Sequence, residues 1–235
     1  MLKDNWMIFK DSETISERLA SDIISIANKS LDKNGKFTIV LAGGVSFINL
    51  YKILRDAKSN WNQWYIYLCD ERCLPKNDKD RNDKKINEVW LNNGKIPKKN
   101  INFICAELDI KDAVEQYELV LENIGNFDLV LLGMGDDGHT ASLFPNHTYN
   151  QNKSVIAEYN SPKYPKKRIS LSYSRLNKSK YVYKLISGPS KLEALNLWIN
   201  GKNLPINQIY GEVEKVYICN DVFYDKCYSG LITIK

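Results

Sequence analysis

Histidine is scarce in this chain, and long apolar runs are missing from it. Only His139 and His147 are histidines among the 235 residues. No apolar run is long enough to span a bilayer. The N-terminal segment MLKDNWMIFK also lacks the pattern of a signal peptide. We therefore expect a cytoplasmic protein with no membrane partner.

The five cysteines are odd in number, are scattered along the chain and include no CxxC pair. This pattern argues against both a disulfide framework and a zinc knuckle. We expect these residues to be small thiols that are buried or half-buried: Cys69, Cys73, Cys105, Cys219 and Cys227.

The net charge of +5 comes from lysines that are spread among acids, and the chain has no long basic tract. A nucleic-acid partner is therefore not expected. A mild positive field would suit a small anionic substrate, although a composition rich in lysine and asparagine explains the charge equally well. The length and the hydrophobic content of 43% fit one α/β domain over residues 1–235.

Apolar runs typical of strands alternate with helical patterns along most of the chain. The alternation predicts an α/β fold with a mostly parallel, Rossmann-like sheet, helices on both faces and short antiparallel additions. The spacing of Thr14 and Glu17 predicts a capping box at the start of the first helix. We expect helices over residues 14–31, 46–57, 84–91, 111–123 and 191–199. We expect strands over residues 37–41, 64–68, 101–105, 127–132, 168–172, 181–187, 215–219 and 231–234.

The most informative stretch is 127–145, FDLVLLGMGDDGHTASLFP, in which a buried strand ends in glycines and leads to Asp136, Asp137 and His139. Open α/β sheets build their sites at this edge, and His139 is the natural group for proton transfer. A histidine merely satisfied in the core is the weaker interpretation. His147 follows in a polar loop and is expected on the surface. The acids and histidines match no metal-binding spacing, so we expect no metal.

A glycine pair, Gly43 and Gly44, lies with Ser46 between a predicted strand and a predicted helix. Such glycines let backbone N–H groups and a helix N-terminus approach an anion. The pair alone is a weak signal, and a tight turn with Ser46 as the N-cap is the favoured interpretation of it.

Two further charged positions stand where elements begin or end. The segment 69–72, CDER, ends a predicted strand and is equally a site or a solvated turn. Arg168 begins a predicted strand, and Lys191 lies in the first turn of a predicted helix. A lysine there opposes the helix dipole, unless an anion binds at that helix end.

In this order, the four stretches resemble the family of 6-phosphogluconolactonases, which shares a superfamily with glucosamine-6-phosphate deaminases. GMGDDGHTASLFP is the most specific part of the resemblance. The first loop reads LAGGVSF where the family typically has LSGGSTP, so Ala42, Val45 and Phe47 depart from the pattern. Arg81 also departs, since a serine precedes the asparagine in the family.

The resemblance implies hydrolysis of 6-phosphoglucono-δ-lactone to 6-phosphogluconate in the oxidative pentose phosphate pathway, without a metal or an organic cofactor. It implies that His139 is the general base, that Asp137 orients it and that Arg72 stabilises the oxyanion. The residues implied around the reacting ring are His139, Asp137, Arg72 and Asp70. The residues implied to bind the phosphate are Gly43, Gly44, Ser46, Arg168 and Lys191. We expect a monomer or a small homo-oligomer.

Two other functions compete with this one. A glucosamine-6-phosphate isomerase/deaminase carries an acidic residue five positions after the histidine, where this chain has Phe144, and a tyrosine where it has Arg72. A non-catalytic sugar-phosphate regulator usually adds a DNA-binding module, for which the helix predicted at residue 14 leaves no room on its N-terminal side. The presence of His139 and Arg72 favours catalysis, but the sequence alone does not separate an inactive binder from an enzyme.

Overall fold

The structure is a computed structural model that describes residues 4–224. Within them, a seven-stranded parallel sheet has the order β1-β10-β9-β6-β2-β3-β5, and a three-stranded antiparallel sheet has the order β4-β8-β7. The strands of the large sheet are β1 (Trp6–Phe9), β2 (Phe37–Leu41), β3 (Trp64–Leu68), β5 (Ile101–Asn102), β6 (Phe127–Gly133), β9 (Ser179–Ile186) and β10 (Val213–Cys219). The small sheet consists of β4 (Asp70–Arg72), β7 (Val155–Glu158) and β8 (Arg168–Leu171). The predicted fold class is confirmed.

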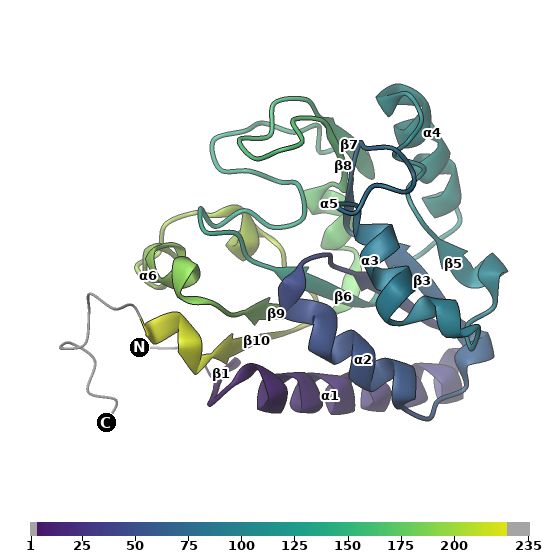
Figure 1. Cartoon of the computed structure of the whole chain (residues 1–235), viewed down its shortest axis with the longest axis horizontal. Coiled ribbons are helices and arrows are strands. Elements are labelled where there is room, and N and C mark those ends of the chain that lie inside the picture. The colour runs from purple at the N-terminus through teal and green to yellow at the C-terminus, as the bar shows by residue number, and fades with distance from the viewer. Residues whose placement is uncertain (1–3, 225–235) are drawn as a thin grey trace.

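Helices follow the strands in the chain and cover the large sheet. They are α1 (Ser12–Asn34), α2 (Ile48–Asp56), α3 (Asn82–Val89), α4 (Ile110–Leu121), α5 (Tyr173–Leu176) and α6 (Leu192–Ile199). The chain crosses the sheet in one direction from β1 to β5 and returns through β6, β9 and β10. Since parallel crossovers are right-handed, this reversal puts α1 to α3 on one face and α4 to α6 on the other. In Figure 1, α1 and α2 lie together below the strands, whereas α4 and the small sheet lie above them.

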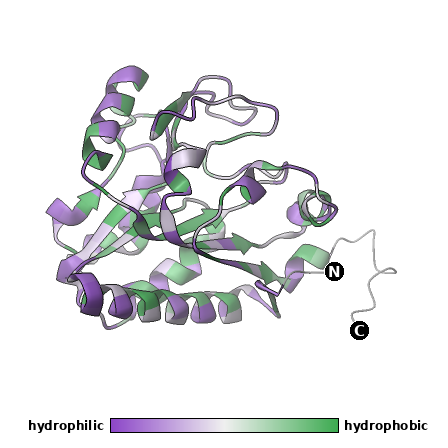
Figure 2. Cartoon of the chain, turned by 180° about the vertical axis from the view of Figure 1, so that it is seen from behind, coloured by the Kyte–Doolittle hydropathy of each residue, from purple (hydrophilic) through white to green (hydrophobic). Residues whose placement is uncertain are grey.

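The core forms between the large sheet and these helices. The strand β6 is buried from Phe127 to Leu132 because it lies in the middle of the sheet with both faces covered. The helix α1 turns Ile15, Leu19 and Ile23 toward the sheet. Figure 2 shows hydrophobic colour gathered in the central strands and alternating along α1, as expected for a helix with one buried side.

The N-terminus of α1 differs from the prediction. Asp11 is the N-cap, and its carboxylate accepts a hydrogen bond from the backbone N–H of Thr14 over 2.8 Å. The predicted capping box of Thr14 and Glu17 is wrong, because the helix begins earlier, at Ser12, and an aspartate already occupies the cap.

Several strands also differ from their predictions. The predicted strand 168–172 is β8, which belongs to the small antiparallel sheet, and the predicted strand 101–105 shortens to β5. The strands β1, β4 and β7 are absent from the prediction. They are at most four residues long, and β4 consists of three charged residues, so none of them gives a clear period-two pattern. The predicted strand 231–234 lies outside the described residues.

The predictions about the cysteines and about membrane-spanning segments can be compared with the structure. Cys69 and Cys219 are buried free thiols, Cys73 and Cys105 are half-buried free thiols, and Cys227 lies outside the described residues. None of the helices found in residues 4–224 combines the length and apolar character needed to cross a bilayer.

The sheet order places a ligand-binding crevice beside β6. The strands β2 and β6 are neighbours, but the connection after β2 runs to β3 and the connection after β6 runs back to β9. Loops that leave neighbouring strands toward opposite faces open a crevice at the carboxyl edge of the sheet. The glycine pair at 43–44 and the segment 136–139 are the loops that border it.

Candidate active site

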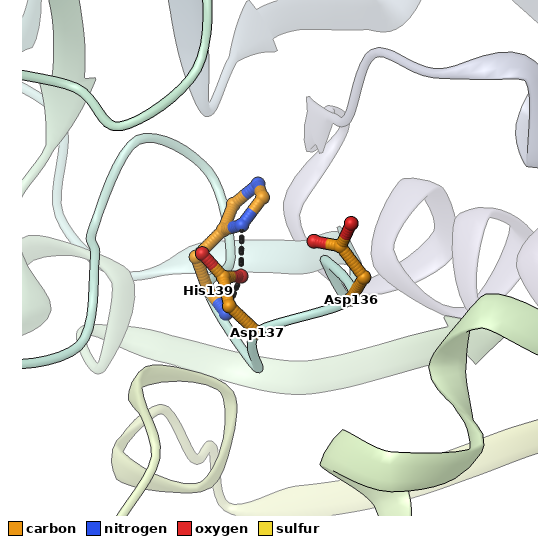
Figure 3. Close-up of side chains that lie close together, drawn as sticks. All are labelled: Asp136, Asp137 and His139. Atoms are coloured by element: carbon orange, nitrogen blue, oxygen red, sulfur yellow. Dashed lines mark hydrogen bonds and ion pairs between the residues drawn. The ribbon is translucent and has the colours of Figure 1, made fainter.

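The imidazole of His139 lies against the carboxylate of Asp137 just beyond the end of β6. Asp137 Oδ1 lies 2.5 Å from Nδ1 of His139 and accepts the backbone N–H of the same residue over 3.0 Å. Figure 3 shows this pair and shows Asp136 apart from it. Burial alone would raise the pKa of Asp137, but the hydrogen bonds and charge of His139 outweigh it and hold this pKa well below its ordinary value.

An ionised Asp137 fixes the tautomer of His139. A carboxylate only accepts hydrogen bonds, so Nδ1 of His139 carries the proton and Nε2 is left as the basic nitrogen. The histidine side chain is 15% exposed, so it is largely shielded from bulk water. This is the arrangement of a general base that is held by a third group.

Asp70 joins the small sheet to the loop that carries His139. Its buried carboxylate accepts hydrogen bonds from Ser142 Oγ over 2.6 Å and from Asn82 Nδ2 over 3.2 Å. Both partners were missed from the sequence as site residues, although Ser142 lies within the most specific motif. The contacts fit a carboxylate that orders the walls of the site.

Gly43 is required by a close approach to Asn82. A Cβ atom at position 43 would lie 2.0 Å from Oδ1 of Asn82, so it would displace the Asn82 side chain from its hydrogen bonds with Asp70. Asn82 begins α3, where its backbone N–H donates to the carboxylate of Glu71 over 2.8 Å. The glycine therefore lets the loop after β2 pack against the start of α3.

Arg81 has a structural task that explains its departure from the family pattern. Its buried guanidinium contacts Asp83, Glu107 and two backbone carbonyls, and these hydrogen bonds use all five N–H donors. No donor remains for a substrate, so Arg81 anchors the start of α3 and leaves the site to Asn82 beside it.

The strands β4 and β8 place two arginines next to each other. Arg72 pairs with Arg168 in the antiparallel register. Nη1 of Arg72 donates to the carbonyl of Asp80 over 2.5 Å, and its buried Nε has no hydrogen-bond partner among the described residues. Neither arginine forms a hydrogen bond with Asp137 or His139 within residues 4–224, so a direct contact of these groups is not seen.

Arg168 holds the loop 163–165, whose Lys163 forms an ion pair with Asp136. Its buried guanidinium donates to the carbonyls of Pro165 over 3.1 Å, Tyr164 over 3.0 Å and Lys163 over 3.3 Å. Burial lowers the pKa of Arg168, and the negative charge of Asp70 opposes this effect. An anion near this arginine would relieve the cost of its burial.

Two matching turns flank the segment that carries His139. Gly44 follows β2 with φ 103° and ψ 156°, and Gly188 follows β9 with φ 94° and ψ 139°. Only glycine adopts this backbone region readily, and each turn opens a short 3₁₀ helix that leads into α2 or α6. Oγ of Ser187 donates to Oγ of Ser46 over 2.9 Å, so the two turns lie in contact.

Lys191 lies in the second of these turns. Its side-chain ammonium is half-buried and forms no hydrogen bond or ion pair within the described part of the chain. Burial lowers its pKa, while the charges of Asp136 and Asp137 raise it. A half-buried cation between two hydroxyl-bearing turns fits an anionic ligand.

Asp136, Asp137 and His139 bring their potential ligand atoms within 4.8 Å of one another. However, His139 and Asp137 bind each other, and Asp136 forms an ion pair with Lys163, a residue that the sequence gave no reason to select. These atoms are thus used in contacts within the chain, and the described residues give no second indication of a metal.

His147 is partly exposed, as predicted, but it also has a buried partner that its sequence position does not indicate. Its Nδ1 lies 2.7 Å from the carboxylate of Glu158, and the residue is half-buried. It lines a pocket of about 250 Å³ with Phe144, Tyr149 and Tyr173, a pocket that does not include His139. The polar sequence around His147 hid this buried partner, which comes from β7.

Comparison with known proteins identifies the family. Residues 10–218 match the sequence model of the glucosamine-6-phosphate isomerases/6-phosphogluconolactonase family. The chain belongs to this family. The match spans the large sheet from α1 to β10 and includes every residue of the candidate active site.

Individual relatives within this family are similar over most of their length. A 6-phosphogluconolactonase from Thermotoga maritima is 36% identical over 192 residues, which cover 80% of this chain and 86% of the relative. The chloroplastic 6-phosphogluconolactonase 3 from Arabidopsis thaliana is 32% identical over 231 residues, with 89% and 71% covered. A crystal structure of the Thermotoga maritima 6-phosphogluconolactonase superposes with a TM-score of 0.84 at 32% identity, covering 91% of this chain and 98% of that one.

Proposed function

We propose that this chain hydrolyses 6-phosphoglucono-δ-lactone to 6-phosphogluconate. The observation that carries the proposal is the pairing of His139 with Asp137, which leaves Nε2 of the histidine free to accept a proton. The names of the similar relatives support the same reaction. The expectation of an enzyme of the oxidative pentose phosphate pathway follows from that substrate.

In the proposed reaction His139 acts first as a base and then as an acid. Nε2 takes a proton from a water molecule while the water oxygen bonds to C1 of the lactone. The tetrahedral intermediate then breaks the bond between C1 and the ring oxygen. The imidazolium returns the proton to that oxygen, which becomes the C5 hydroxyl, and the new carboxylic acid loses its own proton to solvent. The charge of Asp137 stabilises the imidazolium between the two steps.

Arg72 is the proposed stabiliser of the oxyanion on C1. Its guanidinium keeps donors that the described residues do not use, since Nη1 alone makes a side-chain hydrogen bond. A cation that gains its hydrogen bonds only when charge develops on the substrate lowers the barrier. We assign Asp70 to the wall of the reacting ring, where Ser142 and Asn82 hold it.

The proposed phosphate site lies between the two glycine turns. Gly43, Gly44 and Ser46 border it on the side of β2, and Lys191 borders it on the side of β9. Arg168 would complete the positive charge from the small sheet, where it lies beside Arg72. These groups bind the ground state and the transition state alike, so they anchor the ring for the histidine.

The deaminase alternative lacks a group that its chemistry needs. Deamination with isomerisation opens the sugar ring and moves a proton between carbon atoms, which requires several titratable groups around the sugar. The position of the extra carboxylate is Phe144, whose ring is 1% exposed and packs on His139. A lactone already carries its electrophilic carbonyl and needs no such group.

Turnover of fresh 6-phosphogluconolactone, followed in a pH-stat against spontaneous hydrolysis, tests the proposal. The parent protein should consume base far faster than the blank, and His139→Ala should approach the blank. The same protein should release no ammonia from glucosamine 6-phosphate. Ammonia release at a comparable rate would favour the deaminase, and binding of 6-phosphogluconate without turnover would favour a regulator. The cytoplasmic location, the monomer or small homo-oligomer and the independence from nucleic acid stay predictions from the sequence.

A further inference from the structure

The loop that follows His139 is fastened by a tyrosine hydroxyl. Residues 140–143 form a turn in which Thr140 and Leu143 exchange backbone hydrogen bonds, and the next N–H, that of Phe144, donates to the hydroxyl of Tyr149 over 2.9 Å. The following residue, Pro145, has no N–H. The hydroxyl of Tyr149 thus fixes the backbone at the end of this turn.

The hydroxyl of Tyr149 is itself oriented by a buried carboxylate. It donates to Oε2 of Glu158 over 2.8 Å, and the same oxygen lies 2.7 Å from Nδ1 of His147. Oε1 of Glu158 accepts the backbone N–H of Asn160 over 2.6 Å. These hydrogen bonds outweigh burial and keep the pKa of Glu158 below its ordinary value. Because an ionised carboxylate only accepts, Tyr149 must donate to it and is left to accept from Phe144.

The ring of Phe144 connects this network with the proposed base. Its centroid lies 4.7 Å from that of His139 and 5.8 Å from that of His147. The guanidinium of Arg168 lies 5.5 Å from the same ring. The ring is almost fully buried, so a shift of the backbone at Phe144 would move the surface against which the imidazole of His139 rests.

We propose that Tyr149 is a positioning residue for His139, acting through the backbone and the ring of Phe144. The network from Glu158 through Tyr149 to Phe144 holds the Phe144 ring against the imidazole and so fixes the imidazole plane. Asp137 precedes His139 in the chain and Phe144 follows it, so the histidine is held from both of its flanking segments. Asp137 sets the tautomer of His139, and Tyr149 sets the position of the aromatic ring on which His139 packs. This inference rests on the proposed role of His139 as the general base.

The substitution Tyr149→Phe tests the inference because it removes only the hydroxyl. The matched control is Tyr173→Phe, since Tyr173 packs on Tyr149 with ring centroids 6.2 Å apart and its hydroxyl has no hydrogen bond within residues 4–224. We expect kcat of Tyr149→Phe to fall about tenfold with KM within about twofold, since a small misplacement of a catalytic group costs rate. The control should keep both constants.

Proton NMR of the imidazoles gives a readout that does not depend on activity. The chain has two histidines, so His139→Ala assigns both Hε1 signals. We expect Tyr149→Phe to shift the His139 signal, because the ring current of Phe144 changes, and Tyr173→Phe to leave it in place.

The outcomes separate the two proposals. A His139 signal and a kcat that match those of the control would overturn the positioning role. So would a lower melting temperature with an unmoved His139 signal, since the hydroxyl would then act on stability alone. A parent protein that does not hydrolyse the lactone, with the His139 signal still shifted in Tyr149→Phe, would instead overturn the proposed function.

Discussion

Asp136 and Asp137 are neighbours in the chain, yet their carboxylates serve different partners. Asp137 accepts both the backbone N–H and the ring N–H of His139, whereas Asp136 forms an ion pair with Lys163 from the loop that Arg168 holds. The two side chains therefore form a natural pair of variants. The same chemical change at each position separates an effect on the histidine from a general loss of negative charge.

We predict that Asp137→Asn lowers kcat by about 10²–10⁴-fold, as expected for the loss of general base catalysis. Asp136→Asn should lower it far less. An amide at position 137 no longer imposes the tautomer that leaves Nε2 free. Initial rates at saturating lactone check this, and equal losses in the two variants would contradict the role of Asp137.

The pKa of Asp137 also sets an expectation for the pH profile. His139 holds this pKa well below its ordinary value of 3.8, so the carboxylate stays ionised above that pH. We therefore expect that protonation of Asp137 causes no loss of kcat/KM between pH 4 and pH 8. The pH profile of kcat/KM from pH 4 to 8 checks this, and an acidic limb that disappears in Asp137→Asn would contradict it.

We predict that His139→Ala reduces kcat by roughly 10²–10⁴-fold while the fold is kept. The imidazole is partly exposed and lies at the carboxyl edge of the sheet, outside the apolar core, so its loss should leave the fold intact. Turnover together with circular dichroism measures both parts. Near-normal kcat in a folded variant would remove His139 from the mechanism.

Lys191→Ala should act mainly on KM, because a phosphate contact is shared by the ground and transition states. Arg168→Ala should raise KM and also lower kcat, since Arg168 holds the carbonyls of residues 163–165 and lies over Phe144. Steady-state kinetics and the inhibition constant of 6-phosphogluconate distinguish the two. The exposed Lys202 offers a control for a lost surface charge. Unchanged product binding in both variants would place the phosphate site elsewhere.

Activity should survive prolonged treatment with a chelator. The nitrogen of His139 that faces Asp137 is committed to it, and two lysines lie near Asp136, which disfavours a second cation there. Loss of kcat on chelation that one equivalent of a metal restores would indicate a metal-activated water instead.

The opposite end of β6 gives a prediction about stability alone. Asp128 is buried and accepts hydrogen bonds from Ser30, Thr38 and Lys180, which outweigh its burial and lower its pKa below 3.8. Because the pKa of Asp128 is lower in the folded state than in the unfolded state, its charge stabilises the fold at pH values above the ordinary pKa of an aspartate. This stabilisation is lost as the pH falls through the pKa of the folded state. Asp128→Asn should cost about 2 kcal/mol at pH 7 with little change in kcat. Urea unfolding at pH 7 and pH 3 checks this, since the difference from the parent should narrow at pH 3.

The sequence could predict what local patterns determine. The apolar run 127–132 and the glycines after it place the edge of the sheet, and His139 follows from its scarcity and position. The strand β4 escapes such reasoning because its charged residues pair with a strand that lies far along the chain. The contact of Ser46 with Ser187, the approach of Asn82 to Gly43 and the buried partner of His147 arise from tertiary packing between distant segments.

The two matched glycine turns have a consequence for which molecules this site can discriminate. They follow β2 and β9, and β6 lies between these strands in the sheet, so the proposed anion site is centred on the strand that carries His139. Neighbouring strands are held about 4.8 Å apart by backbone hydrogen bonds. The separation between anchor and base is then set by the sheet rather than by flexible side chains. The site therefore selects substrates by the distance between their phosphate and their carbonyl. Esters in which a different number of bonds separates these two groups would bind without reacting.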